Sequence, residues 1–223
     1  MKVCEIFYSI EGEGIEIGRL EVFVRLSGCN LRCSWCDTKY SWEEGKEMSV
    51  EEVIREIRKY PCKSVSITGG EPLLQREEVL ELVKKLKKMG YWIQINTNGT
   101  IFDERIFRIV DLITMDCKCP SSGMKSDLNV LKKTKELFSY KTQFKFVISE
   151  EQDYEYAKKV LSSILTEVSY IIFQPEWNSR KFTSKLVDLV KRDGLNARII
   201  LQQQKMIWGL RKENITIKDL KEC

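Results

Sequence analysis

Short apolar runs alternate with longer segments of helical periodicity along most of the chain. After an apolar run at residues 20–26, further candidate strands lie at residues 64–67, 91–95, 112–115, 143–148, 169–173 and 197–201. The segments between them carry apolar residues at the three- and four-residue spacing of helices that bury one face. Strands that alternate with helices are typical of β-α units joined into a parallel sheet. The pattern therefore predicts an α/β fold with seven strands.

Two of the predicted helices have clear end signals. Ser49 and Glu52 have the spacing of a capping box, in which the serine hydroxyl accepts a hydrogen bond from the glutamate amide. A helix with Val79 and Leu86 on its apolar face should end at Gly90, a residue suited to a left-handed terminus. Weaker helical patterns cover residues 103–110, 127–138, 151–164 and 179–192.

Polar motifs follow the predicted strands at their carboxyl ends. They occupy residues 29–38, 68–72, 96–99, 116–118, 174–175 and 202–205. Loops at the carboxyl ends of barrel strands converge on one mouth, whereas an open doubly wound sheet gathers ligands chiefly at one switch point. The sequence therefore favours a partial or modified (β/α) barrel. Because no linker or charge block divides the chain, we expect a single domain over residues 1–223.

Composition and charge exclude several classes of protein. Lysine and arginine exceed aspartate and glutamate by 37 to 33, and this excess is scattered, unlike the basic stripe of a nucleic-acid binder. No apolar segment approaches the length of a membrane span, and the first residues lack the apolar core of a signal peptide. The eight cysteines occur in a chain too long to need disulfide staples. We therefore expect a cytoplasmic protein that binds neither nucleic acid nor membrane.

Three of the cysteines have a spacing that indicates metal chemistry. Cys29, Cys33 and Cys36 form a C-x3-C-x2-C pattern, which supplies three thiolates where a four-iron cluster would take four. One iron would then be free to bind a small molecule. Zinc is the alternative, but a structural zinc site is closed by four ligands, and the chain has no histidine.

A second motif follows the strand predicted at residues 64–67. In Thr68-Gly-Gly-Glu-Pro72, two adjacent glycines let a ligand approach the backbone, and Glu71 adds an anionic acceptor. The alternative is an ordinary turn with a solvated glutamate. Together the two motifs resemble those of the radical S-adenosylmethionine superfamily. That resemblance implies a 4Fe-4S cluster whose open iron binds S-adenosylmethionine, and an electron from the cluster that splits the cofactor to give a 5′-deoxyadenosyl radical.

A closer resemblance extends over most of the chain. Residues 5–14, 23–30 and 35–40 are similar to the 7-carboxy-7-deazaguanine synthase family, and the likeness continues at residues 68–72, 98–99, 116–118, 174–175 and 205–209. It implies conversion of 6-carboxy-5,6,7,8-tetrahydropterin to 7-carboxy-7-deazaguanine with loss of ammonia, in queuosine or archaeosine biosynthesis. It also implies Mg²⁺, an unidentified electron donor and a homodimer.

The same resemblance assigns residues to three groups of ligands. The pterin would contact Ile10, Glu11, Gly12, Glu13, Arg25 and Thr68. The cluster would be held by Cys29, Cys33 and Cys36, and Mg²⁺ by Thr38. S-adenosylmethionine would contact Trp35, Cys36, Asp37, Gly70, Glu71, Asp116, Cys117, Lys118, Gln174 and Pro175.

A purely structural role is the alternative for several of these residues. Arg25 could pair with a surface acid, Glu11 and Glu13 could lie in a solvated loop, and Thr38 could cap a turn. A planar guanidinium nevertheless suits a carboxylate, which favours a substrate-binding role for Arg25. Mg²⁺ keeps several waters and takes few protein ligands, so a single hydroxyl is acceptable.

The chain departs from the family pattern at three places. Glu11 stands where the family usually has glutamine, Gln204 precedes Lys205 where a histidine is common, and Cys117 and Cys119 flank the lysine of the 116–118 motif. Gln204 cannot titrate near neutral pH, so a proton-transfer role there is in doubt. The cysteines at positions 4, 62, 117, 119 and 223 are expected to be buried or incidental thiols, and the aromatic residues at positions 92, 144 and 146 are expected to lie in the core.

Two rival functions remain open from the sequence. A glycyl-radical enzyme activase has the same cysteine spacing but acts on a protein glycine, and it would not need the residue 10–13 and Arg25 constellation. A nonenzymatic iron-sulfur or zinc module would use the cysteines for structure alone.

Overall fold

Nine strands form one continuous sheet in the computed structural model, which describes residues 1–209. In sheet order they are β3 (Lys46–Glu47), β1 (Lys2–Ile10), β2 (Leu20–Leu26), β4 (Ser64–Gly69), β5 (Trp92–Thr97), β6 (Leu112–Asp116), β7 (Thr142–Ile148), β8 (Tyr170–Pro175) and β9 (Arg198–Ile199). β1 runs antiparallel to its neighbours β2 and β3, and every pair from β2 to β9 is parallel. The parallel part therefore matches the predicted β-α pattern.

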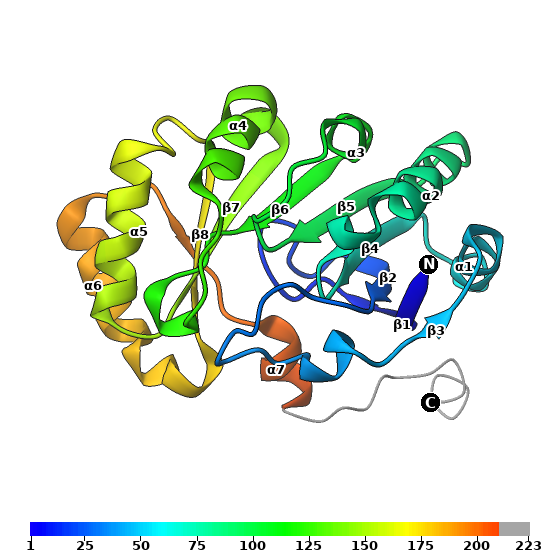
Figure 1. Cartoon of the computed structure of the whole chain (residues 1–223). Coiled ribbons are helices and arrows are strands. Elements are labelled where there is room, and N and C mark those ends of the chain that lie inside the picture. The colour runs from blue at the N-terminus through cyan, green and yellow to red at the C-terminus, as the bar shows by residue number, and fades with distance from the viewer. Residues whose placement is uncertain (210–223) are drawn as a thin grey trace.

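Within residues 1–209, six α-helices lie on the outer side of the curved sheet and a seventh lies on the opposite side (Figure 1). The outer helices are α1 (Val50–Ile57), α2 (Arg76–Lys88), α3 (Glu104–Ile109), α4 (Leu128–Phe138), α5 (Glu151–Ser163) and α6 (Thr183–Asp193), and the seventh is α7 (Gln203–Trp208). The sheet does not close, because β3 and β9 are its two edges. The prediction of a partial barrel is confirmed.

The predicted count of seven strands was wrong for residues 1–209, because β1 and β3 were missed. β1 is mostly half-buried and mixes charged with apolar residues, so its sequence lacks the apolar run that marks the other strands. β3 has only two residues and exists through its pairing with β1. The short helix α7 was also missed, and the predicted helix at 179–192 divides into a 3-10 segment (Trp177–Phe182) and α6.

The local end signals behave as predicted. The Ser49 hydroxyl accepts from the Glu52 amide at 3.2 Å, and the Glu52 carboxylate accepts from the Ser49 amide at 2.7 Å, which completes the capping box of α1. Gly90 has a φ of 76° just after α2, a conformation that glycine adopts without strain.

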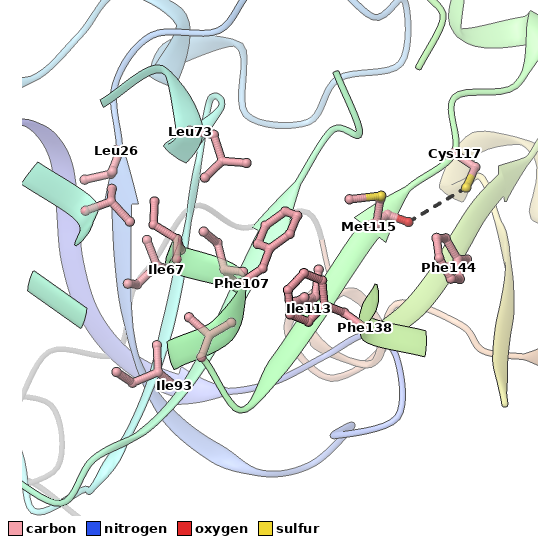
Figure 2. Close-up of a cluster of buried hydrophobic side chains, with 14 of the residues drawn as sticks. Leu26, Ile67, Leu73, Ile93, Phe107, Ile113, Met115, Cys117, Phe138 and Phe144 are labelled. Carbon is pink, nitrogen blue, oxygen red and sulfur yellow. Dashed lines mark hydrogen bonds between the residues drawn. The ribbon is translucent and has the colours of Figure 1, made fainter. Parts of the chain in front are cut away.

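The two faces of the sheet differ in chemistry. Val65, Ile67 and Ile113 are fully buried in the main hydrophobic cluster, which packs between the strands and the outer helices (Figure 2). Phe144 and Phe146 belong to this core, as predicted. The prediction was wrong for Trp92, which is half-buried outside that cluster. The opposite, concave face carries polar side chains.

Candidate active site

A cavity of about 290 Å³ lies on the concave side, at the carboxyl ends of the parallel strands. The predicted site residues that line it are Ile10, Glu11, Gly12, Glu13, Arg25, Cys29, Cys33, Trp35, Cys36, Asp37, Thr38, Thr68, Gly70, Asp116, Lys118 and Gln174. These residues come from the carboxyl ends of five strands, β1, β2, β4, β6 and β8, and thus meet in one place although they are far apart in the sequence. Three predicted residues do not line this cavity: Glu71 and Cys117 are buried behind it, and Pro175 faces a smaller neighbouring pocket.

The three motif cysteines lie in the loop after β2 and face this cavity. The Cys29 sulfur accepts from the Leu31 amide at 3.4 Å and from the Asn98 side-chain amide at 3.9 Å. Hydrogen bonds to sulfur stabilise thiolates and tune iron-sulfur clusters, so these donors suit a cluster site. Within residues 1–209, no three Cys, Asp or Glu side chains lie close enough to hold a single metal ion. A cubane needs no such group, since each cysteine binds a different iron.

The glycine pair is packed directly against the cysteine loop. The Gly70 amide donates to the Leu26 carbonyl at 2.9 Å, and the Glu71 amide donates to the Gly28 carbonyl at 2.7 Å. A Cβ on Gly70 would lie 1.9 Å from the Gly28 carbonyl oxygen. Only glycine therefore lets the two loops approach so closely and leaves this edge of the cavity open to a ligand.

Glu71 has a different place from the one predicted. It is fully buried, and its carboxylate accepts from the Leu73 amide at 3.0 Å, the Thr97 hydroxyl at 2.9 Å and the Asn98 amide at 2.6 Å. Burial raises the pKa of Glu71 to about 7, although these hydrogen bonds oppose the rise. Glu71 thus braces the ends of β4 and β5 instead of facing the cavity.

Glu11 is a buried acid at the cavity wall. One carboxylate oxygen accepts from the Glu13 amide at 3.0 Å, and the other accepts from the Gln94 side-chain amide at 2.7 Å. Burial raises the pKa of Glu11 to about 8, and the nearby charges of Glu21 and Glu13 add to the rise. Glu11 is therefore largely protonated at neutral pH, so it presents a neutral group where the family usually has the neutral amide of glutamine.

Glu13 lies two residues after Glu11 and has the opposite protonation state. Its carboxylate accepts from Lys145 at 2.7 Å, from Gln202 at 2.7 Å and from Gln204 at 3.2 Å. Burial alone would raise the pKa of Glu13, but Lys145 and the two amides lower it to about 2. Glu13 is therefore ionised, and α7 and β7 hold it in place.

Arg25 faces the cavity from β2. Its Nε donates to Glu5 at 2.6 Å, and the Tyr40 hydroxyl donates to the same carboxylate oxygen at 2.8 Å. Glu5 is the register partner of Arg25 on β1, so strand pairing itself fixes the ion pair. The guanidinium therefore has both an acidic partner and access to the cavity.

Charged side chains also line the part of the cavity nearest the cysteines. Lys118 pairs with Asp116 at 2.6 Å and its ammonium lies 5.2 Å from the centre of the Trp35 ring. Lys205 pairs with Asp37 at 2.7 Å. Burial alone would raise the pKa of Asp116, but Lys118 and Lys145 hold it below its ordinary value.

The departures from the family pattern have clear structural places. Gln204, which stands where the family commonly has a histidine, donates a hydrogen bond to Glu13. Cys117 and Cys119 are buried, and burial raises the pKa of both thiols well above its ordinary value. Both belong to the hydrophobic core, which confirms the prediction of buried thiols. Cys4 and Cys62 are partly exposed and free, and Cys223 lies outside the described residues.

Lys145 is the clearest cavity residue that the sequence reasoning missed. It lies between Phe144 and Phe146 in β7, and both of these face the core. Because strand residues alternate between faces, a lysine between two core phenylalanines should have been placed on the concave side. Asn96, Asn98 and Gln202 line the cavity as well, and all three fall in motifs that the sequence had marked as polar.

None of the helices in residues 1–209 combines the length and apolar character that a membrane crossing requires.

Known proteins resemble this chain in sequence and structure. The family model described as Radical SAM superfamily matches residues 23–117. A 7-carboxy-7-deazaguanine synthase from Methanospirillum hungatei is 41% identical over 208 residues, which cover 93% of this chain and 85% of the relative. A protein of the same name from Koribacter versatilis is 35% identical over 226 residues, covering 93% and 97%. The crystal structure of QueE from Escherichia coli has a TM-score of 0.72 and 26% identity, covering 91% of this chain and 93% of that one.

Proposed function

Because this chain belongs to the 7-carboxy-7-deazaguanine synthase family, we propose that its cavity converts 6-carboxy-5,6,7,8-tetrahydropterin to 7-carboxy-7-deazaguanine with loss of ammonia. The chain is a radical S-adenosylmethionine enzyme of deazapurine biosynthesis, with a 4Fe-4S cluster and S-adenosylmethionine as cofactors. One observation supports the assignment of this cavity above others. The three motif cysteines, Gly70 and Arg25 line the same 290 Å³ space.

The residues nearest the cysteines would bind S-adenosylmethionine. When bound, the cluster and this cofactor supply a 5′-deoxyadenosyl radical that removes a hydrogen atom from the substrate. Gly70 leaves room for a ligand beside the cysteine loop, and Asp116 and Lys118 offer an anion and a cation for its polar groups. Glu71 would not contact the cofactor, because its oxygens already accept three hydrogen bonds, and it would instead hold the ends of β4 and β5 in place beside this region.

Arg25 on β2 and the acids of the loop after β1 would bind the pterin. Arg25 would bind the substrate carboxylate, to which a guanidinium is well matched. Glu13 is ionised and would accept hydrogen bonds from ring nitrogens, whereas the neutral Glu11 can donate one. Loss of ammonia requires a proton on the departing nitrogen, and Glu11 is the cavity carboxyl whose pKa of about 8 suits that task. Two carboxyls with such different pKa values are typical of an acid and a stabilising anion.

Thr38 would provide the hydroxyl ligand of Mg²⁺. It lines the cavity beside Cys36, with 3.7 Å between the hydroxyl oxygen and the sulfur. Mg²⁺ commonly keeps waters and binds substrate oxygens, so one protein ligand is acceptable. The metal would then help to position the substrate on the cysteine side of the cavity.

A turnover assay tests the proposed function. Cluster-loaded protein is incubated anaerobically with the pterin, S-adenosylmethionine, reductant and Mg²⁺, and 7-carboxy-7-deazaguanine is measured by mass spectrometry. We expect product from the wild type, a strongly raised KM for the pterin in Arg25→Ala, and no change in Arg58→Ala, an exposed control. A protein that cleaves S-adenosylmethionine but forms no deazapurine would rule out the assignment.

The relatives support the synthase over the two rival functions. All of those reported above carry synthase or QueE names, and none is named an activase or a structural iron-sulfur module. An activase would form a radical on a partner protein and would be indifferent to Arg25→Ala. The turnover assay therefore distinguishes the synthase, which forms the deazapurine, from the activase, which does not.

Several finer proposals rest on the family resemblance. We place the enzyme in the cytoplasm as a homodimer of single-domain chains spanning residues 1–223, reduced by a separate electron-donor protein. The continuous sheet of residues 1–209 supports the single domain, and the exposed Met206 and Ile207 on α7 are available for a dimer contact. Light scattering of the purified protein tests the dimer. Analysis of tRNA in a deletion strain distinguishes a queuosine from an archaeosine end product.

A further inference from the structure

Lys145 bridges two carboxylates that come from different segments of the chain, the loop after β1 and the end of β6. Its ammonium lies 2.7 Å from Glu13 and 3.1 Å from Asp116, and only 9% of the residue is exposed. Within residues 1–209, it is the cation that pairs with both of these acids. An ammonium has three N–H donors, so it can serve both carboxylates at once.

The fold fixes the Asp116 side of this bridge. Asp116 and Lys145 are register partners on the adjacent strands β6 and β7, and the Cys117 amide donates to the Lys145 carbonyl at 2.7 Å. The distance between these two side chains is therefore set by sheet pairing. Lys118 holds the other oxygen of Asp116 at 2.6 Å, which leaves the first oxygen for Lys145.

The Glu13 side belongs to a loop that has few other ties to β7. The loop follows β1, and its Ile15 amide donates to the Gln143 side chain on β7 at 2.8 Å. On its other side, the Gly12 carbonyl accepts from the Gln203 amide of α7 at 2.9 Å. Lys145 thus joins the carboxylate of Glu13 on this loop to the carboxylate of Asp116 at the end of β6.

The charges explain why the bridge matters. Glu13 and Asp116 are both ionised, and without Lys145 the two anions would share a poorly hydrated space with less compensation. Removing one partner of a buried ion pair leaves an uncompensated charge, which rearranges or takes up a proton. A movement of either carboxylate would therefore move the Lys145 ammonium, and the other carboxylate would lose or gain contact with it.

We propose that Lys145 is a positioning residue that couples the pterin-binding loop to the S-adenosylmethionine side of the cavity, so that binding of one ligand prepares the site of the other. This inference rests on the proposed assignment of Glu13 to the pterin and of Asp116 to S-adenosylmethionine. Coupling between two sites is reciprocal, so either ligand should tighten the other by the same factor. Such factors are typically about 5–150-fold.

Calorimetry with the oxidised, cluster-loaded enzyme tests the coupling without turnover. S-adenosylmethionine is titrated into the enzyme with and without saturating 6-carboxy-5,6,7,8-tetrahydropterin, and the ratio of the two Kd values is the coupling factor. We expect at least about a fivefold ratio in the wild type and a ratio within about twofold of unity in Lys145→Met. Lys145→Arg should recover part of the ratio, because it retains the charge.

Control variants separate this role from a merely structural one. Lys141→Met, which removes a lysine just before β7 that donates to the carbonyls of Arg108 and Val110, should keep the wild-type ratio. If Lys145→Met fails to load its cluster, Lys145→Gln and Lys145→Arg are measured instead, and the same loss is expected for Gln only. A wild-type ratio of unity, or an unchanged ratio in the neutral variants, overturns the inference. The wild-type turnover assay is independent, so product formation without coupling would reject this inference and leave the proposed function intact.

Discussion

The protonation of Glu11 predicts how the stability of the protein depends on pH. Burial raises the pKa of Glu11 to about 8, with help from Glu21 and Glu13, from an ordinary value of 4.5. Between these two values the native chain keeps a proton that the unfolded chain has released, so stability falls as pH rises. Below the lower value both states are protonated, and above the higher value both are ionised. A difference of one proton changes the free energy of unfolding by about 1.4 kcal/mol per pH unit.

Glu11→Gln should remove the contribution of Glu11 to this dependence while keeping a side chain of the same size at position 11. An amide oxygen at position 11 can still accept from the Glu13 amide. The Gln94 side-chain nitrogen faces position 11, and the Gln94 side-chain oxygen is buried without a partner within residues 1–209. When the Gln94 amide turns over, this oxygen can accept from the new amide nitrogen. Between about pH 5.5 and 7.5, the wild type should lose about 3 kcal/mol relative to the variant. For a chain of this size, that is a relative fall in Tm of roughly 5–10 °C.

Thermal unfolding followed by circular dichroism measures the effect on cluster-loaded protein. The chain has no histidine, which removes the residue that usually dominates titration in this range. Glu71, whose pKa burial raises to about 7, is present in both the wild type and Glu11→Gln, so its contribution cancels in the difference between them. Glu136→Gln, an exposed glutamate on α4, is the matched control and should follow the wild type at every pH. If the difference in Tm between Glu11→Gln and the wild type stays constant over this pH range, Glu11 does not hold a proton and the acid role proposed for it is wrong.

Three further substitutions test other parts of the structure. Gly70→Ala should lower the iron and sulfide content after reconstitution, because its Cβ would lie 1.9 Å from the Gly28 carbonyl oxygen. Gly90→Ala is the control for backbone strain: its φ of 76° disfavours alanine, but its Cβ meets nothing within 4 Å, so it should keep its cluster. Equal loading of both variants would contradict the argument. Phe146→Ala should lower the free energy of unfolding in urea by about 3–5 kcal/mol, since the ring is fully buried, and a loss below about 1 kcal/mol would contradict the assigned core. Thr38→Ala should raise the Mg²⁺ concentration needed for half-maximal turnover by about tenfold or more while Thr38→Ser stays near the wild type, and identical curves would place the metal elsewhere.

The features that could be predicted from the sequence are those with local causes. The strand at Leu20–Leu26 and the capping box at Ser49 depend on neighbouring residues, and both were predicted correctly. The convergence of motifs followed from one topological rule, that parallel strands present their carboxyl ends at one edge. β1 could not be predicted in this way, because it is a half-buried strand that is stabilised by pairing with β2 across the sheet.

Errors within the site have a common physical reason. A family motif names consecutive residues, but successive strand residues point to opposite faces. At the end of β6 and just beyond it, Asp116 and Lys118 line the cavity while Cys117, between them, enters the core. Gln174 reaches it while Pro175 does not, and Lys145 reaches it from between two core residues. Applying the two-residue period inside each motif would have corrected most of these placements.

The same alternation separates stability from chemistry in this fold. A closed β/α barrel fills its interior with bulky apolar side chains, whereas here the inward positions include Thr114 and Gln143, which are buried and share a hydrogen bond of 2.6 Å. The strands are therefore held chiefly by the apolar face that packs on the outer helices (Figure 2). The inner face needs partners for its polar groups more than it needs apolar packing, and this leaves a polar floor under the cavity. Substitutions on the outer face should change the free energy of unfolding alone, whereas substitutions on the inner face should also change ligand binding and its pH dependence.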